Sequence, residues 1–298
     1  MSSSSFINLI RKIQAQSVIK QMKGQSLPDG VSVFSDIHYL HDNTVNHSLD
    51  VYYPEHVEGL LPIVISIHGG AFVAGDKFYN KEFGMRLALQ NFCVININYD
   101  LAPEVDLIDM VQSVNQALIW VYRHGKEYHG DIKQIYGLGD SAGGWQVITY
   151  SIVNNNKYLR AKYNFLLENP IKFNALALIC PVANVKKAMD KNSRIKWFRN
   201  AVYNNGENGD DYKLTSIQDI IRYSQLPPTL IVTTKNDHYY YQSIELVDLY
   251  NQYKYPYQLL DVKDVSNKLD HCFNIMHPLF EESIKTNETI AEFFIRNR

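Results

Sequence analysis

The sequence alternates between short apolar stretches and longer segments whose apolar residues recur at helical spacing. The apolar stretches are rich in β-branched residues and lie at 63–67, 92–97, 132–136, 175–180, 229–233 and 257–262. Parallel strands that are covered by helices on both faces have this composition, because neither face meets water. The pattern therefore predicts a mainly parallel central sheet.

Helical segments separate these strands and complete the alternation. They are expected at 81–90, 108–126, 143–154, 241–253 and 279–295. Strand, helix and strand in repetition define an α/β fold. Ligands of such folds bind beyond the carboxyl ends of the strands, so the residues directly after each strand are the candidates for chemistry.

Three segments lie outside this alternation. Two strands at 31–40 and 48–53, separated by a polar turn, precede the first buried strand. Residues 6–23 form an amphipathic helix, interpreted as a packing helix with a membrane-surface helix as the alternative. Residues 182–226 are polar, with a helical piece near 195–203, and are longer than a usual connection. We interpret them as an insertion over the site, with a disordered loop as the alternative.

Composition excludes several classes of protein. The 298 residues allow two domains by length alone, and 46% apolar with 20% charged residues excludes a disordered chain. The net charge of −2 has no long block of one sign, so nothing indicates nucleic-acid binding. The apolar runs are shorter than the roughly 18 residues of a membrane span. Residues 6–23 carry basic residues and lack the apolar core of a signal peptide, so a cytoplasmic location is expected.

Cysteine usage indicates buried free thiols. Cys93, Cys180 and Cys272 are far apart in the sequence, and each lies in or beside an apolar stretch. This number and spacing do not fit a disulfide framework or a paired-cysteine metal site. Since no His-Glu-x-x-His motif is present either, neither a metal nor an organic cofactor is expected.

A candidate nucleophile follows the third buried strand. The run Gly137–Gly144 contains Gly-x-Ser-x-Gly with Ser141 at its centre and opens a predicted helix. Small residues two positions before and after the serine let strand and helix approach closely, so the hydroxyl projects from a sharp turn. The run also fits the dinucleotide fingerprint Gly-x-Gly-x-x-Ala. That alternative is disfavoured because the run lies mid-chain and lacks the acidic residue expected about 20 positions later.

A candidate oxyanion loop follows the first buried strand. It reads His68-Gly69-Gly70-Ala71-Phe72, about 70 residues before the candidate nucleophile. Small residues let main-chain N–H groups reach a substrate oxygen, so Gly70 and Ala71, together with Ala142 at the helix start, are the predicted oxyanion donors. Gly69 and His68 are expected to support this loop. Because His68 lies inside the turn, we interpret it as a loop organiser and not as a base.

A serine nucleophile requires a base and an acid that orients the base. In an α/β fold of this kind the chain order is serine, acid, histidine. Asp237 follows the fifth buried strand and is the predicted acid, with a helix N-cap as its alternative role. His271 follows the last strand and is the predicted base. The competing candidates are His68, His238 and His277 for the base, and Asp261, Asp264 and Asp270 for the acid.

Three consecutive tyrosines follow the predicted acid. Tyr239, Tyr240 and Tyr241 begin the next helical segment. They are candidates for the mouth of a substrate pocket. The alternative is amphipathic packing of the rings with the hydroxyls pointing outward.

Together these motifs resemble the hormone-sensitive-lipase-like and related esterase branch of the α/β-hydrolase family. The resemblance extends from about Asp50 to the C-terminus. It is carried by His68–Phe72, Gly75-Asp76-Lys77, Tyr99-Asp100-Leu101-Ala102-Pro103-Glu104, Gly139–Gly144, Asp237 and His271-Cys272-Phe273. It implies one α/β-hydrolase domain over 1–298, with a small helical cap formed by 1–28 and about 182–226. It also implies a small-molecule ester substrate with a short acyl chain, no cofactor, and the homodimer common among relatives.

The sequence departs from the family pattern at several positions. Asp100 stands where arginine is usual, Ala71 replaces a third glycine, and Cys272 replaces the glycine after the histidine. Asp237-His238-Tyr239 stands in place of the family's Asp-Pro-Leu.

The sequence thus predicts a serine carboxylic ester hydrolase that acts through Ser141, His271 and Asp237. Two alternatives remain open at this stage. One is an amide hydrolase, such as a formamidase or small peptidase, with the same three residues. The other is a non-catalytic ligand receptor on the same fold.

Overall fold

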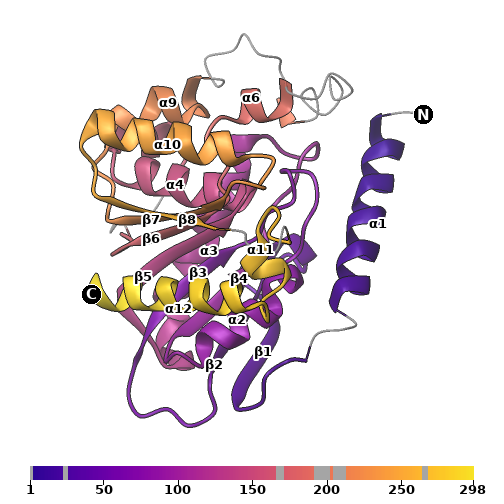
Figure 1. Cartoon of the computed structure of the whole chain (residues 1–298), viewed down its shortest axis with the longest axis vertical. Helices are drawn as coiled ribbons and strands as arrows, with labels where there is room; N and C mark the ends of the chain where they lie inside the picture. The colour runs from indigo at the N-terminus through magenta and orange to yellow at the C-terminus, as the bar shows by residue number, and fades with distance from the viewer. Residues whose placement is uncertain (1–2, 23–25, 166–170, 191–201, 204–212, 264–267) are drawn as a thin grey trace.

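The computed structural model describes residues 3–22, 26–165, 171–190, 202–203, 213–263 and 268–298. Their centre is one eight-stranded sheet with the order β1-β2-β4-β3-β5-β6-β7-β8 (Figure 1). The strands are β1 (Val31–His38), β2 (Ser48–Pro54), β3 (Leu61–Ile67), β4 (Cys93–Ile97), β5 (Gly130–Asp140), β6 (Leu176–Ile179), β7 (Thr229–Thr234) and β8 (Tyr257–Val262). Strand β2 runs antiparallel to both β1 and β4, and every pairing from β4 to β8 is parallel.

Helices cover both faces of this sheet. Those of the α/β alternation are α2 (Lys81–Ala88), α3 (Leu107–His124), α4 (Ala142–Asn154), α10 (Tyr240–Tyr253) and α12 (Glu281–Arg296). The remaining described helices are α1 (Ser3–Met22), α5 (Lys157–Lys162), α6 (Val185–Asp190), α9 (Ile217–Ile220) and α11 (Phe273–Met276), with the 3-10 turns η1 (Val45–His47), η2 (Lys77–Asn80), η3 (Gly125–Tyr128) and η5 (Ile221–Tyr223).

The apolar strands divide the core into two layers. Ile63, Ile65 and Ile67 of β3 belong to the layer that contains α3, α4 and α10. Val64, which points to the other face of the same strand, belongs to the layer that contains α2 and α12. Successive side chains of a strand alternate between faces, so a continuous apolar run serves both layers at once. The predicted α/β fold with a mainly parallel sheet is confirmed.

Two element boundaries differ from the prediction in an informative way. Strand β5 begins before the apolar run 132–136 and continues to Asp140, because its glycines and Asp140 pair with β3 and β6. Strand β6 is shorter than the predicted 175–180 and ends at Ile179. Most of the helical piece expected near 195–203 lies outside the described residues.

The segments predicted to form a cap lie outside the central layers. Helix α1 runs along one side of the molecule, and α6 and α9 lie beside α10 (Figure 1). In α1, Ile7 is buried whereas Leu9, Ile13 and Ile19 are exposed. Among the helices that the structure describes, none combines the length and the apolar character needed to cross a membrane.

Candidate active site

The three predicted site residues follow strands of one contiguous half of the sheet. Ser141 directly follows β5, Asp237 follows β7, and His271 follows β8. Because β5, β6, β7 and β8 are neighbours and run parallel, their carboxyl ends lie at the same edge. The topology therefore brings residues that are far apart in the sequence to one place.

Ser141 lies on a strained turn between β5 and α4. Its φ of 51° and ψ of −114° are unusual for a residue with a side chain. The turn is held by two backbone hydrogen bonds: the Ser141 N–H donates to Ile179 O at 2.9 Å, and the Val182 N–H donates to Ser141 O at 3.0 Å. A Cβ on Gly143 would overlap the carbonyl oxygen of Ile67, so only glycine permits this approach of α4 to β3. The geometry is that of a nucleophile elbow.

Asp237 and His271 form a buried contact. The His271 Nδ1 lies 2.8 Å from Asp237 Oδ1, which also accepts a hydrogen bond from the Tyr239 N–H at 2.8 Å. The Asp237 side chain is fully buried, whereas the His271 side chain remains 21% exposed. The other histidine next to Asp237, His238, lies 3.8 Å from the same oxygen and is 64% exposed. The distances favour His271 over His238 as the partner of Asp237.

The competing candidates have other surroundings. His277 stacks on Phe280 with ring centroids 4.7 Å apart. Asp261 accepts a hydrogen bond from the Tyr240 hydroxyl at 2.9 Å, and Asp270 is exposed. Asp264 lies outside the described residues.

The pair is electrostatically coupled. Burial by itself would lower the pKa of His271, but the hydrogen bond with Asp237, helped by one with Cys180, outweighs burial and raises it. Burial would conversely raise the pKa of Asp237, but the hydrogen bond and charge of His271 hold it below its usual value. Asp237 is thus ionised and favours an imidazole that can carry a positive charge, as the orienting acid of a base must.

The predicted oxyanion loop adopts left-handed backbone conformations. Gly70, Ala71 and Phe72 have φ values of 138°, 55° and 68°. The loop packs directly against Ser141, because a Cβ built on Gly69 would lie 3.1 Å from the Cβ of Ser141 and 2.6 Å from Asp140 Oδ2. The structure therefore brings the two predicted halves of the oxyanion hole together.

His68 is fully enclosed within this loop. Its Nδ1 lies 2.7 Å from Gly69 O, and its ring stacks on Tyr99 with centroids 4.5 Å apart. The Tyr99 hydroxyl donates to the carbonyl oxygen of His68 at 2.8 Å. Burial lowers the pKa of His68, which keeps the imidazole neutral. These contacts agree with its interpretation as a loop organiser.

Sequence reasoning gave no role to Asp140, the residue before the nucleophile. One of its oxygens accepts the Gly69 N–H at 3.0 Å, and the other accepts from the Asn80 side chain at 2.9 Å. Asp140 therefore ties the oxyanion loop to the strand that carries Ser141. An acidic residue at the carboxyl end of a buried strand was the signal that could have identified it.

The residue that holds α1 beside the site was also not predicted. Arg11 donates to Val73 O at 2.7 Å and to Ala102 O at 3.0 Å, and it forms an ion pair with Glu104 at 2.6 Å. Val73 directly follows the oxyanion loop. Arg11 therefore fixes α1 beside that loop.

The three tyrosines after Asp237 do not share one role. The Tyr239 ring meets His271 edge-on with centroids 5.3 Å apart, so it lies at the site. The Tyr240 hydroxyl donates to Asp261, and that of Tyr241 donates to Lys187 O of α6 at 3.4 Å. The hydroxyls of Tyr240 and Tyr241 thus form hydrogen bonds with β8 and α6 near the protein surface.

The cysteines are free and buried, as predicted. Two of them are nevertheless neighbours in space, which their sequence spacing conceals. The Cys272 N–H donates to Cys180 Sγ at 3.3 Å. The thiols of Cys180 and Cys272 and a nitrogen of His271 all lie within 4.8 Å of one another. The spacing excludes a short-range paired-cysteine motif but not this contact, because β6 and the loop after β8 bring the two thiols together.

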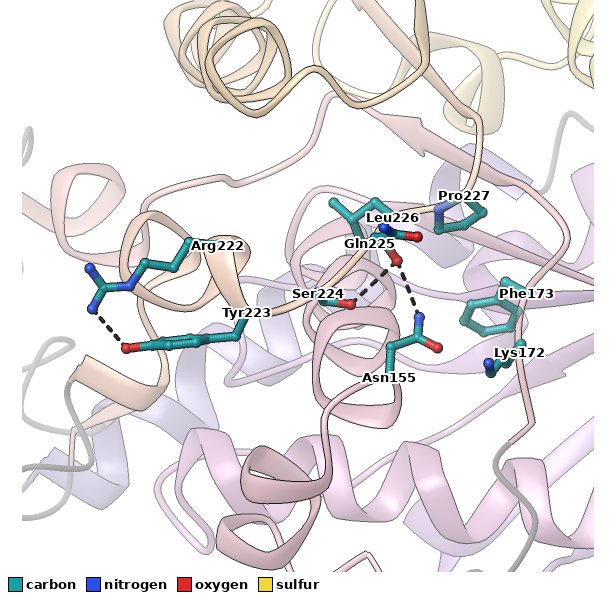
Figure 2. A pocket seen from close by; sticks show the side chains of 9 residues that line it. All are labelled: Asn155, Lys172, Phe173, Arg222, Tyr223, Ser224, Gln225, Leu226 and Pro227. Atoms are coloured by element: carbon teal, nitrogen blue, oxygen red, sulfur yellow. Dashed lines mark hydrogen bonds between the residues drawn. The ribbon is translucent and has the colours of Figure 1, made fainter.

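A cavity lies at the opposite edge of the sheet. It has a volume of about 640 Å³ and is lined by residues before β6 and β7, among them Phe173, Leu226 and Pro227 (Figure 2). Asn155 and Ser224 donate to the carbonyl oxygen of Gln225 at its wall. Because these residues precede the strands, the cavity is separate from the site at the carboxyl ends.

The sheet order, the elbow at Ser141 and the position of the oxyanion loop together define an α/β-hydrolase. The chain belongs to the BD-FAE family of α/β-hydrolase carboxylesterases, whose family model matches residues 49–250.

Comparison with solved structures supports the same fold. Esterase B of Lactobacillus rhamnosis superimposes with a TM-score of 0.91 at 24% identity, covering 100% of this chain and 97% of that one. An esterase of Pyrobaculum calidifontis superimposes with a TM-score of 0.70 at 20% identity, covering 99% and 92%.

Sequence relatives match a shorter part of the chain. The isoprenylcysteine alpha-carbonyl methylesterase of Arabidopsis thaliana is 35% identical over 95 residues, which are 32% of this chain and 22% of that protein. The chain spans about a fifth to just over half of the curated relatives it matches.

Proposed function

We propose that this protein is a serine carboxylic ester hydrolase acting on small esters with short acyl chains. The observation that carries the proposal is the buried 2.8 Å contact between His271 and Asp237. This pair lies at the sheet edge that also holds Ser141 on its elbow. The family membership supports the same reaction class.

Each group has a defined task in the proposed mechanism. The Ser141 hydroxyl attacks the acyl carbonyl while His271 takes its proton, and Asp237 holds the imidazole and stabilises its charged form. His271 then returns the proton to the leaving alcohol. Water, activated by the same imidazole, attacks the acyl-enzyme and releases the acid. Groups of the chain and water complete every step, so the mechanism requires no cofactor.

The oxyanion of each tetrahedral intermediate is assigned to main-chain N–H groups of Gly70, Ala71 and Ala142. The packing of Gly69 against Ser141 supports this assignment, because it places the loop next to the attacking oxygen. One such donor contributes about 10²–10³ in turnover. The Asp140 and His68 contacts hold the loop in place before substrate binds, so no reorganisation is needed during reaction.

The substrate class is inferred from the site and from a structural neighbour. One structure of esterase B of Lactobacillus rhamnosis contains a tributyrin phosphonate. We propose that α1, α6 and α9 act as the cap and that they limit the acyl chain. Arg11 and Tyr241 support this, because they link α1 and α6 to the segments around the site.

The test is hydrolysis of p-nitrophenyl esters of increasing acyl length. Ser141→Ala and His271→Ala should each lose activity by about 10⁶-fold, with the acetate and butyrate esters being the best substrates of the unchanged protein. Asp237→Asn should lose about 10⁴-fold, whereas the matched control Asp270→Asn keeps its activity. Activity that survives in Ser141→Ala would contradict the mechanism.

Two further measurements separate the remaining alternatives. An organophosphonate should label Ser141 covalently, and a ligand receptor without catalytic activity would not be labelled. Matched amide substrates, such as p-nitroanilides, should react far more slowly than the esters. Faster cleavage of the amides would reassign the reaction.

A further inference from the structure

Two cysteines surround the imidazole that the proposed function uses as its base. Cys180 directly follows β6, and Cys272 is the residue next to His271. Both are buried, and their sulfur atoms and a nitrogen of His271 all lie within 4.8 Å of one another. Two thiols and an imidazole in one place form a set of soft ligands.

The backbone around these thiols is specialised. Cys180 and Cys272 have φ values of 46° and 58°, in the left-handed region that favours glycine. A cysteine retained in this region costs backbone energy that glycine would avoid. The Cys272 N–H donates to Cys180 Sγ at 3.3 Å. A main-chain N–H directed at a sulfur stabilises negative charge on it, as outer-shell hydrogen bonds do in metal–thiolate sites.

We propose that Cys180, Cys272 and His271 form a binding site for a soft divalent cation of the zinc class, and that the bound ion inhibits the enzyme. The inhibition rests on the proposed ester hydrolysis, whereas the binding does not. Zinc binds sulfur at about 2.3 Å and imidazole nitrogen at about 2.0–2.1 Å, so its tetrahedral ligand atoms lie about 3.5–3.8 Å apart. Ligand atoms that are already within 4.8 Å need to close by about 1.3 Å at most.

Binding removes the base whichever ring nitrogen coordinates. A metal on Nε2 occupies the lone pair that would take the serine proton. A metal on Nδ1 replaces the 2.8 Å hydrogen bond with Asp237, and the ring proton moves from Nδ1 to Nε2, so Nε2 can no longer take the serine proton. In either case two metal–sulfur bonds and one metal–nitrogen bond form, the thiol protons pass to solvent, and no oxidant is needed. Water fills the fourth position.

The direct test is a titration of the reduced, full-length protein with Cd²⁺ in the absence of substrate. Cd²⁺ is a spectroscopic substitute for zinc, because thiolate-to-cadmium charge transfer absorbs in the near ultraviolet. We expect one ion per chain with the absorption of two thiolates. Cys180→Ser and Cys272→Ser should each lose half of that absorption and weaken binding by about 100-fold.

The third cysteine offers a matched control. Cys93 is buried in β4 and takes no part in the cluster, so Cys93→Ser should bind Cd²⁺ as the unchanged protein does. Cys272→Gly is a second variant that favours the left-handed backbone, which keeps the test valid if a serine variant fails to fold. Binding that persists in Cys272→Gly with two-thiolate absorption would overturn the proposal.

Inhibition is measured separately with Zn²⁺ and p-nitrophenyl butyrate. We expect saturable inhibition that EDTA reverses and that is lost in Cys272→Gly, with each variant compared with its own metal-free rate. Recovery by a thiol reductant and not by EDTA would show a Cys180–Cys272 disulfide instead and overturn the proposal. Binding without inhibition would overturn the capture of the base. If phosphonate fails to label Ser141 while Cd²⁺ binds as expected, the proposed function fails and the metal site stands.

Discussion

Gly69 lies between the proposed oxyanion loop and Ser141, so Gly69→Ala tests the proposed site directly. The added methyl group would lie 2.6 Å from Asp140 Oδ2, about 0.8 Å short of the 3.4 Å at which ordinary contacts begin. It would also lie 3.1 Å from the Cβ of Ser141. Neither neighbour can yield freely, because Asp140 is buried and hydrogen-bonded and Ser141 lies on the strained elbow. The loop must therefore move away from Ser141 by close to 1 Å.

A displacement of this size should affect the reaction rate more than the stability of the protein. A misplacement of about 1 Å in an active site costs about 10²-fold in rate, whereas overpacking a buried site costs about 1–3 kcal/mol in stability. We therefore expect kcat/KM of Gly69→Ala for p-nitrophenyl butyrate to fall about 100-fold while the protein stays folded. The loss should appear mainly in kcat, because the oxyanion donors act in the transition state.

The control for stability is Gly59→Ala. Gly59 has a φ of 84°, and a Cβ there would meet nothing within 4 Å. An alanine at this φ costs about 1–2 kcal/mol of backbone strain in a loop before β3, without touching the site. If Gly59→Ala and Gly69→Ala lose similar stability in urea but only Gly69→Ala loses kcat, the loss of kcat comes from displacement of the loop at residues 69–72. A Gly69→Ala enzyme with unchanged kcat/KM would refute the role assigned to residues 69–72.

Three further predictions concern protonation, the N-terminal helix and a buried ion pair. Because His271 has a raised pKa and acts as a base only when neutral, kcat/KM should rise with pH with a midpoint above 6.5, and Cys180→Ala should lower that midpoint in a pH–rate profile. Arg11→Ala removes the hydrogen bonds to Val73 and Ala102, each of the charged kind worth about 1.5–3 kcal/mol, so amide hydrogen exchange in α1 should accelerate at least about tenfold. Lys77 contacts Asp50 at 2.9 Å with both side chains buried; Lys77→Ala leaves that carboxylate unpaired and should lower the free energy of unfolding in urea by about 3–5 kcal/mol.

The buried strands could be predicted from the sequence because burial on both faces requires a continuous run of apolar residues. A run such as Ile63–Ile67 must be buried on both faces, and this alone indicates a central parallel strand. The extension of β5 to Asp140 could not be predicted in the same way. Three of its last four residues are Gly137, Gly139 and Asp140, types with low strand propensity, and they are extended because β3 and β6 pair with them.

The candidate triad could be predicted because the chemistry restricts residue type and strand position together. Its supporting contacts could not. Asp140 meets Gly69 across 71 positions of sequence, and Arg11 meets Glu104 across 93. Such contacts follow from the order in which strands are placed in the sheet, and a pattern along the chain carries no record of them.

The cysteine cluster also depends on the order of the strands in the sheet and not on spacing along the chain. Paired-cysteine zinc sites place two cysteines a few positions apart in the sequence, so wide spacing argues against that kind of site only. Here Cys180 directly follows β6 and Cys272 lies in the loop after β8, and β6 and β8 flank β7 in the sheet. The arrangement that brings His271 to Asp237 therefore also brings Cys180 to His271 and its sequence neighbour Cys272. Because the same edge of the sheet positions the proposed base and both thiols, the proposed inhibition by soft metal ions follows from this topology.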